Sequence, residues 1–160
     1  MEIRDKSGKV LLVQDDSDHN FSDADLRNAD LRDIELEGYC FDDADLRGAD
    51  FAGTDLYMAR FFRANCEGAI FRNCLLKGAE FESANLRNCD LHGADLSRDN
   101  IGGQTRLPNA DLRGANLAGA DFDGALLAGA DLTGARYDRK TRFPPGFDPA
   151  HHGMTLVGGA

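Results

Sequence analysis

Residues 109–137 read NADLRGANLAGADFDGALLAGADLTGARY, and this stretch decides the fold. A large apolar residue recurs every five positions, with Ala two places before it; the apolar residues are Leu112, Leu117, Phe122, Leu127, Leu132 and Tyr137. The same step recurs from about Phe21 onward, over most of the 160-residue chain. One local rule therefore governs most of the structure.

A five-residue step fits neither an α-helix nor a flat strand. In a helix, five residues advance about 500°, so successive leucines would point about 140° apart and form no apolar face. In a strand, side chains alternate between faces, so an odd step would send successive leucines to opposite faces. A short extended piece followed by a corner keeps each Ala and Leu pair pointing inward. Four such sides close into a square coil.

Closure after four sides predicts that residue i lies beneath residue i+20. Three columns obey this spacing: Phe21, Phe41, Phe61 and Phe81; Leu31, Phe51, Phe71 and Leu91; and Leu36, Leu56, Leu76 and Leu96. We expect the Phe21 column to continue through Ile101, Phe122 and Phe143, with one extra residue in each of two longer steps. The extra residues fall in two similar segments, 101–108 and 137–144, which contain Thr-Arg-apolar-Pro. We interpret each as a six-residue side with a bulge or loop.

From about Phe21 to Phe143 the pattern resembles the pentapeptide repeat family, whose motif is A(D/N)LXX. The resemblance implies an all-β fold, a right-handed quadrilateral β-helix, and the handedness and turn types come from the resemblance alone. The 24 inward positions from Phe21 to Tyr137 make about six coils. We expect an N-terminal capping hairpin over residues 1–14, the β-helix over 15–143, and a C-terminal cap and tail over 144–160.

Both ends of the chain depart from the repeat. Glu2–Asp5 and Lys9–Gln14 read as two strands around a turn that contains glycine, and such a hairpin could cover an open apolar end. At the other end Pro144 stops the ladder because proline has no N–H to donate. Phe143 and Phe147 are then candidates to plug the last coil.

Composition excludes several classes of function. The net charge of −10 argues against direct binding to nucleic acid or to an acidic membrane. No signal peptide and no apolar run long enough to span a bilayer are found, so we expect a cytoplasmic location. Cys66, Cys74 and Cys89 should point inward and Cys40 outward, which is typical of structural cysteines in a reducing compartment.

The sequence contains no pattern typical of catalysis. We find no nucleophile paired with a base, no phosphate-binding loop and no metal-ligand spacing, so we expect no enzyme and no cofactor. His151 and His152 form a conceivable metal pair, but neighbouring histidines in a tail are usually just exposed. The carboxylates lie at outward positions, and none is forced into the apolar interior, where its pKa would rise.

Two outward sides carry columns of opposite charge. In one, Asp25 and Asp45 flank Arg27, Arg47 and Arg87; in the other, Asp30, Asp50, Asp90, Asp111 and Asp131 flank Arg32, Arg72 and Arg113. The Arg column relieves the repulsion of carboxylates stacked about 4.8 Å apart. We interpret these columns as a solvated surface rather than a binding site.

An outward cluster of apolar and Arg side chains interrupts this surface between residues 57 and 75. Tyr57, Met58 and Phe62 surround one corner of the third coil, and Leu75 stacks one coil above Asp55 on the side of Tyr57. Exposed apolar side chains beside Arg are typical of protein contacts. The sequence predicts a contact surface made of Tyr57, Met58, Arg60, Phe62, Arg63, Ile70 and Leu75. The alternative is that these residues only cover one another, or that they take part in a crystal contact or a contact between copies of the chain.

Two functions remain open from the sequence. The first is a non-enzymatic, monomeric, rigid protein-interaction rod with an unknown partner. The second follows from the resemblance, because some pentapeptide repeat proteins mimic duplex DNA and bind type II topoisomerases, protecting gyrase from quinolones. An acidic rod suits that alternative, since duplex DNA carries one negative charge per about 1.7 Å. Those family members, however, dimerise through a C-terminal helix and often project longer loops, whereas here residues after Phe147 lack a helical pattern and each expected insertion is one residue.

Overall fold

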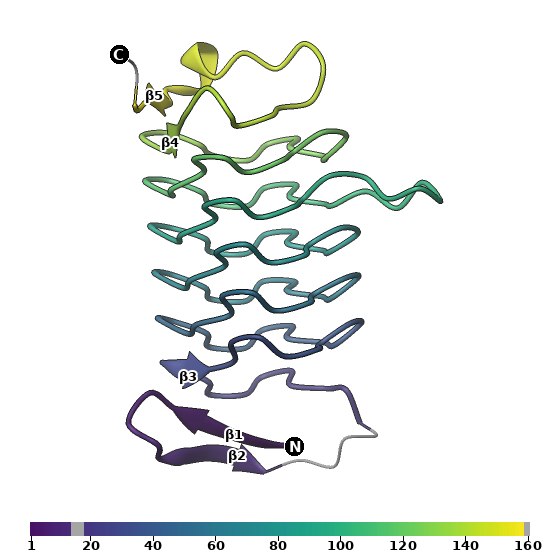
Figure 1. Cartoon of the computed structure of the whole chain (residues 1–160), viewed down its shortest axis with the longest axis vertical. Coiled ribbons are helices and arrows are strands. Elements are labelled where there is room, and N and C mark those ends of the chain that lie inside the picture. Colours follow the sequence, from purple (N-terminus) through teal and green to yellow (C-terminus); the bar gives the residue numbers. More distant parts are fainter. Residues whose placement is uncertain (14–17, 159–160) are drawn as a thin grey trace.

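The computed structural model describes residues 1–13 and 18–158, which form a stack of coils between an N-terminal hairpin and a C-terminal turn (Figure 1). The expected boundary between residues 14 and 15, and the last two residues of the tail, lie outside the described residues. In chain order the elements are β1 (Glu2–Asp5), β2 (Val10–Val13), β3 (Ala29–Asp30), β4 (Arg136–Tyr137), the 3₁₀ helix η1 (Ala150–His152) and β5 (Thr155–Leu156).

Most of the chain pairs through isolated parallel bridges rather than through long strands. Asp25 bridges Asp45, which in turn bridges Asn65, so the bridged residues are 20 positions apart. Below the last coil, the inward apolar residues donate their N–H groups to carbonyls of the next coil, as Phe41 does to Arg60 (2.7 Å). The chain is therefore a β-helix of parallel-paired coils, as the five-residue step predicts.

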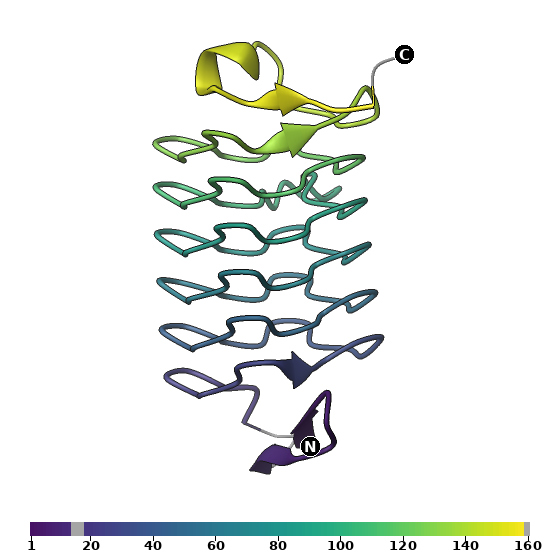
Figure 2. The same cartoon turned by 90° about the vertical axis from the view of Figure 1, so that its left-hand side faces the viewer.

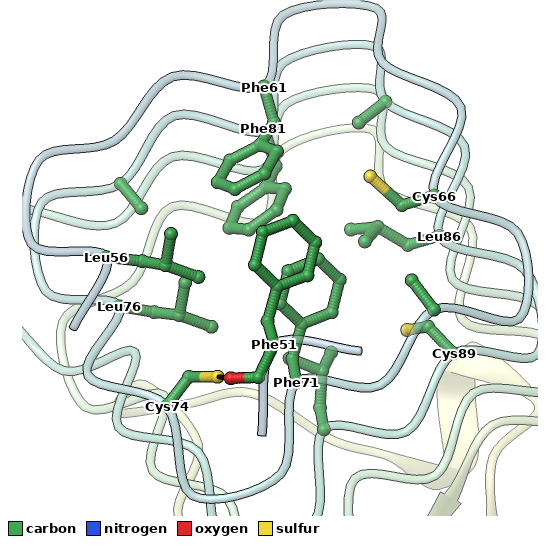
Figure 3. Close-up of a cluster of buried hydrophobic side chains, with 14 of the residues drawn as sticks. Phe51, Leu56, Phe61, Cys66, Phe71, Cys74, Leu76, Phe81, Leu86 and Cys89 are labelled. Atoms are coloured by element: carbon green, nitrogen blue, oxygen red, sulfur yellow. Dashed lines mark hydrogen bonds between the residues drawn. The ribbon is translucent and has the colours of Figure 1, made fainter. Parts of the chain in front are cut away.

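The inward side chains fill the square. We name the four sides after their inward residues in the first coil: the Phe21, Leu26, Leu31 and Leu36 sides. On the Phe21 side, the rings of Phe41, Phe61 and Phe81 stack with centroids 4.9 and 4.6 Å apart. On the Leu31 side, Phe51 and Phe71 stack at 5.0 Å and meet the first set edge to face (Figure 3). All five rings are fully buried, and the predicted phenylalanine column is confirmed.

At some small inward positions a Thr or Cys side chain also binds the neighbouring coil. The Thr105 hydroxyl donates to the Leu76 carbonyl at 2.8 Å. The Cys74 thiol donates to the Phe51 carbonyl, also at 2.8 Å (Figure 3). Burial raises the pKa of the Cys74 thiol to about 12, so the thiol stays neutral. The cysteines are placed as predicted: Cys66, Cys74 and Cys89 are buried, and Cys40 is half-buried.

The first longer step was predicted wrongly, because the insertion has six residues and not one. Glu80 bridges Arg106, 26 positions further along the chain. Ile101, assigned to the core by its spacing, is 86% exposed, and the fully buried Leu107 lies above Phe81 instead. Residues 99–104, which we call the projecting loop, leave the stack and extend away from it (Figure 1).

Asp99 explains why Ile101 does not point inward. A side centred on Ile101 would place Asp99 at the small inward position, where its carboxylate would be buried at high cost. The Asp99 carboxylate instead accepts the N–H groups of Ile101 (2.9 Å) and Gly103 (2.6 Å), which closes the turn of the projecting loop. The coil resumes at Thr105, the first small inward residue after the loop.

The second longer step has one extra residue, as predicted, but lies on another side. Asp121 bridges Arg142, 21 positions further along, and the rings of Phe122 and Phe143 stack at 5.9 Å. Because Asp95 bridges Asp121, these rings belong to the Leu36 side and not to the Phe21 side. The misassigned side is a direct consequence of the missed insertion.

Short strands lie at both ends of the stack (Figure 2). β1 pairs antiparallel with β2 on one edge and with β3 of the first coil on the other, and Ile3 of β1 is 2% exposed within the core cluster. At the C-terminal end β5 pairs parallel with β4. The role of these ends as caps, and the boundaries of the three segments, remain predictions.

Two adjacent phenylalanines test the inward and outward assignment. Phe61→Ala should lower the free energy of unfolding by about 3–5 kcal/mol, because Phe61 is fully buried between two stacked rings. Phe62→Ala should cost no more than about 1 kcal/mol, because Phe62 is partly exposed. Urea unfolding of both variants makes the comparison, and equal losses would contradict the inward and outward assignment.

Candidate functional site

Five of the seven predicted contact residues form one continuous stretch across two adjoining sides. Tyr57 follows the inward residue of the Leu36 side, and Met58, 50% exposed, is the corner that leads to the Phe21 side. Arg60 and Phe62 are outward residues of the Phe21 side, and Arg63 is the corner at its far end. We call the outward residues of this stretch, Tyr57, Met58, Arg60, Phe62 and Arg63, the corner surface.

The other two predicted residues lie in separate ladders. Leu75 bridges Asp55 on the Leu36 side, which is the side of Tyr57. Ile70 bridges Asp50 on the Leu31 side, so a whole side separates it from the corner surface. Leu75 therefore adjoins the corner surface, whereas Ile70 does not.

The side chains of the corner surface partly cover one another. The Arg63 guanidinium carbon lies 4.8 Å from the centre of the Phe62 ring. The same guanidinium donates from Nε and Nη2 to the two oxygens of Asp43, at 2.8 and 2.6 Å, and this pairing lowers the pKa of Asp43. Arg60 forms an ion pair with Asp42. The thioether of Met58 thus remains the most exposed apolar group of the corner surface.

Met58 and Arg63 adopt a backbone conformation that is unusual for long side chains. Both have φ of +55°, in the left-handed region. At the other positive-φ corners of residues 21–137, the chain uses Gly, Asp or Asn, apart from Ser83. A residue with a Cβ atom loses about 1–2 kcal/mol in this conformation, and Asn and Asp lose less because their side chains bond locally. Strain of this kind clusters at functional sites.

The projecting loop, which the sequence analysis missed, is tied to the corner surface. The Tyr57 hydroxyl donates to a carboxylate oxygen of Asp99 at 2.7 Å, joining positions 42 residues apart in the chain. The loop also carries Ile101, the most exposed large apolar residue of the part that the structure describes. The sequence did contain a signal for this loop, namely Asp99 at a position that needs a small inward residue.

This hydrogen bond shifts the pKa of both partners. The Tyr57 hydroxyl and three backbone N–H groups lower the pKa of Asp99, and the bond to Asp99 raises the pKa of Tyr57. Both shifts favour ionised Asp99 with neutral Tyr57. We call this hydrogen bond between Tyr57 and Asp99 the tether. Its contribution to stability is fully present between the ordinary pKa values of the two groups, about 4 and 10. It is lost as pH falls through the lowered pKa of Asp99 or rises through the raised pKa of Tyr57.

The charged columns consist largely of exposed, two-pronged ion pairs. Arg27 binds both oxygens of Asp25, at 2.8 and 2.6 Å, and holds its pKa at about 2. Arg113 binds Asp111 in the same way. Because Asn85 bridges Asp111, one assignment is corrected: Asp111, Asp131 and Arg113 continue the column of Asp25 and Asp45 on the Leu26 side. These pairs neutralise much of the acidic surface locally.

Within residues 1–13 and 18–158, no group of three or more His, Cys, Asp or Glu side chains is placed to hold a metal ion. The two tail histidines have separate partners: His152 stacks on the Phe147 ring at 4.4 Å, and His151 pairs with Asp148. No helix among the described residues is long and apolar enough to cross a membrane.

Comparison with known proteins identifies one family. The family model described as Pentapeptide repeats matches in eight copies over residues 20–57, 40–78, 59–98 and 104–136, which is more than half of the chain. The gap between the last two matches contains most of the projecting loop. No curated protein matches the sequence.

Several solved structures share the fold. A pentapeptide repeat protein from the Arabidopsis thaliana thylakoid lumen is 29% identical, with a TM-score of 0.53, over 75% of this chain and 73% of its own. Rfr23, from the cyanobacterium Cyanothece 51142, is 22% identical, with a TM-score of 0.54, over 71% and 84%. Trypsin-treated QnrB1, a plasmid-mediated fluoroquinolone resistance protein, is 22% identical, with a TM-score of 0.55, over 87% and 78%.

Removing the Tyr57 hydroxyl tests the tether. Tyr57→Phe should leave the coils intact but loosen the projecting loop, because Asp99 loses its partner. Limited trypsin cleavage after Arg98 should then become several-fold faster at neutral pH. In the parent protein, cleavage should also accelerate as pH rises through the raised pKa of Tyr57, after correction for the activity of trypsin itself. Tyr137→Phe is the matched control, and equal cleavage of both variants would contradict the tether.

Proposed function

The chain belongs to the pentapeptide repeat family, and we propose that it acts without catalysis as a rigid rod that binds a protein partner. One observation supports this proposal above the others. Met58 and Arg63 carry backbone strain at the two ends of a single exposed side, where Gly or Asn would relieve it. The fold does not require this backbone strain, because other residue types fit the same corners. Such strain is expected where the side chains themselves contact a partner.

The β-helix suits the role of a rigid support. Each coil is fixed to its neighbours by bridges on its sides and by stacked rings within, so the exterior side chains are held at constant spacing. In such repeat folds each coil contacts only its neighbours, and an extended surface is available for binding. Binding energy is then not spent on ordering the backbone.

The proposed contact comprises the corner surface, with Leu75 beside it and the projecting loop tied to it through Tyr57. Its composition of Tyr, Met, Phe and Arg is the one enriched in protein interfaces. Ile70, on another side, would lie at most at the margin of such a contact. The proposal also includes that the rod is monomeric and lies in the cytoplasm. The cytoplasmic location is supported by the four cysteines, which form no disulfide.

Replacing Met58 and Arg63 by Asn tests whether these two side chains serve binding and not stability. Met58→Asn and Arg63→Asn should each raise the free energy of unfolding, by up to about 1 kcal/mol, because Asn tolerates the left-handed conformation better. The double variant should fail to capture the proteins that the parent captures after crosslinking in extracts of the source organism. Urea unfolding and mass spectrometry provide the two measurements.

Ser83→Asn is the control for this experiment. Ser83 is a positive-φ corner one coil beyond Arg63, outside the corner surface, so its replacement should stabilise the fold and leave the captured proteins unchanged. Unchanged capture by the Met58→Asn, Arg63→Asn variant would remove the corner surface from the proposal.

A second candidate is an acidic DNA mimic that binds a type II topoisomerase. The six-residue insertion favours it, since a long projecting loop was one feature that the sequence analysis found lacking. The two-pronged Asp–Arg pairs disfavour it, because they neutralise the acidic columns. QnrB1 is a fluoroquinolone resistance protein of the same fold, but 22% identity supports the shared fold alone.

A supercoiling assay distinguishes the two candidates. If the chain is a simple interaction rod, DNA gyrase should supercoil plasmid at an unchanged rate in the presence of micromolar protein. Inhibition that disappears in an Ile101→Ser variant would instead favour the topoisomerase-binding candidate, because Ile101 is the exposed apolar residue of the projecting loop.

A further inference from the structure

The ladder of the Phe21 side ends without a partner at the last coil. On the Phe21 side, every inward residue from Phe21 to Leu107 donates its N–H to the next coil, ending with Leu107 N–H to Leu126 O at 2.8 Å. The corner residues donate in the same way, ending with Asn109 N–H to Ala128 O at 3.0 Å. Within the described chain, the next donors of this series, the N–H groups of Leu127 and Gly129, have no acceptor.

The acceptor of the same series is also free. Each small inward residue of the Phe21 side presents its carbonyl to the next coil, as Thr105 does to the N–H of Leu126 at 2.9 Å. The next such carbonyl, that of Ala125, receives no N–H from any described residue. Two donors and one acceptor therefore form an unpaired edge along residues 125–129.

The C-terminal segment pairs with the Leu31 side of the last coil and with one residue of the Leu26 side, but, as far as the structure describes the chain, it makes no ladder bond to the Phe21 side. β5 pairs with β4 on the Leu31 side, and Gly134 on the Leu26 side donates to Gly153 at 2.9 Å. After Phe143, the two prolines 144 and 145 cannot donate to a ladder, and the chain turns at Phe147, whose N–H bonds back to Pro144 at 3.1 Å. The chain rejoins the stack only beyond residue 150.

A pocket of about 400 Å³ lies over the open edge. The edge residues 125–129 form one wall, and Pro144, Pro145, Gly146, Phe147 and His152 form the other. Leu127 is only partly buried here, although the inward residues of the sides before it, such as Leu117 and Phe122, are 0% exposed. An inward core position is thus open to solvent beside free backbone groups.

We propose that this edge binds an extended segment of a partner protein, which adds one parallel strand to the Phe21 side. The ladder fixes the pairing. A residue k of the segment donates its N–H to Ala125 O and accepts from Leu127 N–H, and residue k+2 accepts from Gly129 N–H, because those are the bonds made at every lower coil. This mode of recognition gives affinity through the main chain and specificity through alternate side chains.

The same register specifies the side chains of the segment. Residue k−1 lies over Ala125 and must be small, whereas residue k+1 lies over Leu127 and is large and apolar, as in the coils below. The flanks are expected to be acidic. Among the described residues, no Asp or Glu side chain lines the pocket to repel an acidic segment, and its lining includes His152.

A partner segment fits better than a second copy of this chain. The small-x-large segments of the described coils are already paired within their own stack, so a copy could offer one only by unwinding. The other exposed apolar strand, β2, already pairs on one edge with β1 and ends at Val13 without the small-x-large pattern. This contact is independent of the corner surface, which lies several coils away.

A short peptide probes the edge directly. Acetyl-Glu-Ala-Glu-Leu-Glu-Gly-amide has the required order of small, polar and apolar residues. In ¹H–¹⁵N spectra of the full chain, its addition should shift the amide signals of Leu127 and Gly129 selectively and slow their hydrogen exchange. N-methylation of the Glu before Leu should weaken binding about tenfold, because it removes one backbone hydrogen bond. Replacement of Leu by Ser should weaken binding at least as much.

A variant that introduces a negative charge at the edge, with a matched control elsewhere, tests the proposed site. Ala128→Glu places a carboxylate at the rim of the pocket and should weaken binding of the acidic peptide, whereas Ala52→Glu, at the equivalent position of a paired side, should not. Absence of selective shifts at millimolar peptide, or equal binding of the N-methylated peptide, overturns the proposal. So does a dimeric parent protein whose Leu127 and Gly129 amides are already protected, because a second copy would then occupy the edge.

Discussion

The structure depends on one constraint: between the two ends of the stack, each five-residue side must hydrogen-bond to the coils before and after it while it buries a small and a large apolar side chain. Phe61 shows the two parts together, since its N–H binds Glu80 at 2.7 Å and its ring is stacked between Phe41 and Phe81. Away from the two ends of the stack, a side that lacks either part cannot remain in it. The projecting loop leaves it where Asp99 would have to be buried, and the C-terminal segment leaves it where two prolines cannot donate.

This constraint also decides how much could be predicted from the sequence. The phenylalanine columns, the inward cysteines and the parallel pairing at 20 residues follow from counting, because each position is tested by the coils on both sides of it. Ile101 was wrongly assigned to the core because only the spacing of large apolar residues was counted. The assignment did not require a small residue two positions earlier, where the sequence has Asp99. That one error moved Phe122 to the wrong side and Asp111 to the wrong column.

The candidate site was less predictable than the core. The exposed Tyr, Met and Arg residues can be found from the sequence, since they occupy outward positions. The left-handed φ of Met58 and Arg63 cannot, because a corner is compatible with several residue types and only coordinates give the angle. The contact of Tyr57 with Asp99 depends on the loop length, and the open edge at Leu127 depends on the path of the chain after Phe143. Each of these features arises where the regular ladder is interrupted.

The register across the projecting loop is the point on which the remaining assignments depend, because it sets every column beyond residue 96 and releases the loop from the core. Nuclear Overhauser contacts to the Phe81 ring measure that register directly. The structure predicts contacts from the methyl groups of Leu107, which is fully buried above Phe81, and none from Ile101. Contacts from Ile101, without those from Leu107, would contradict the six-residue insertion and with it the placement of the projecting loop.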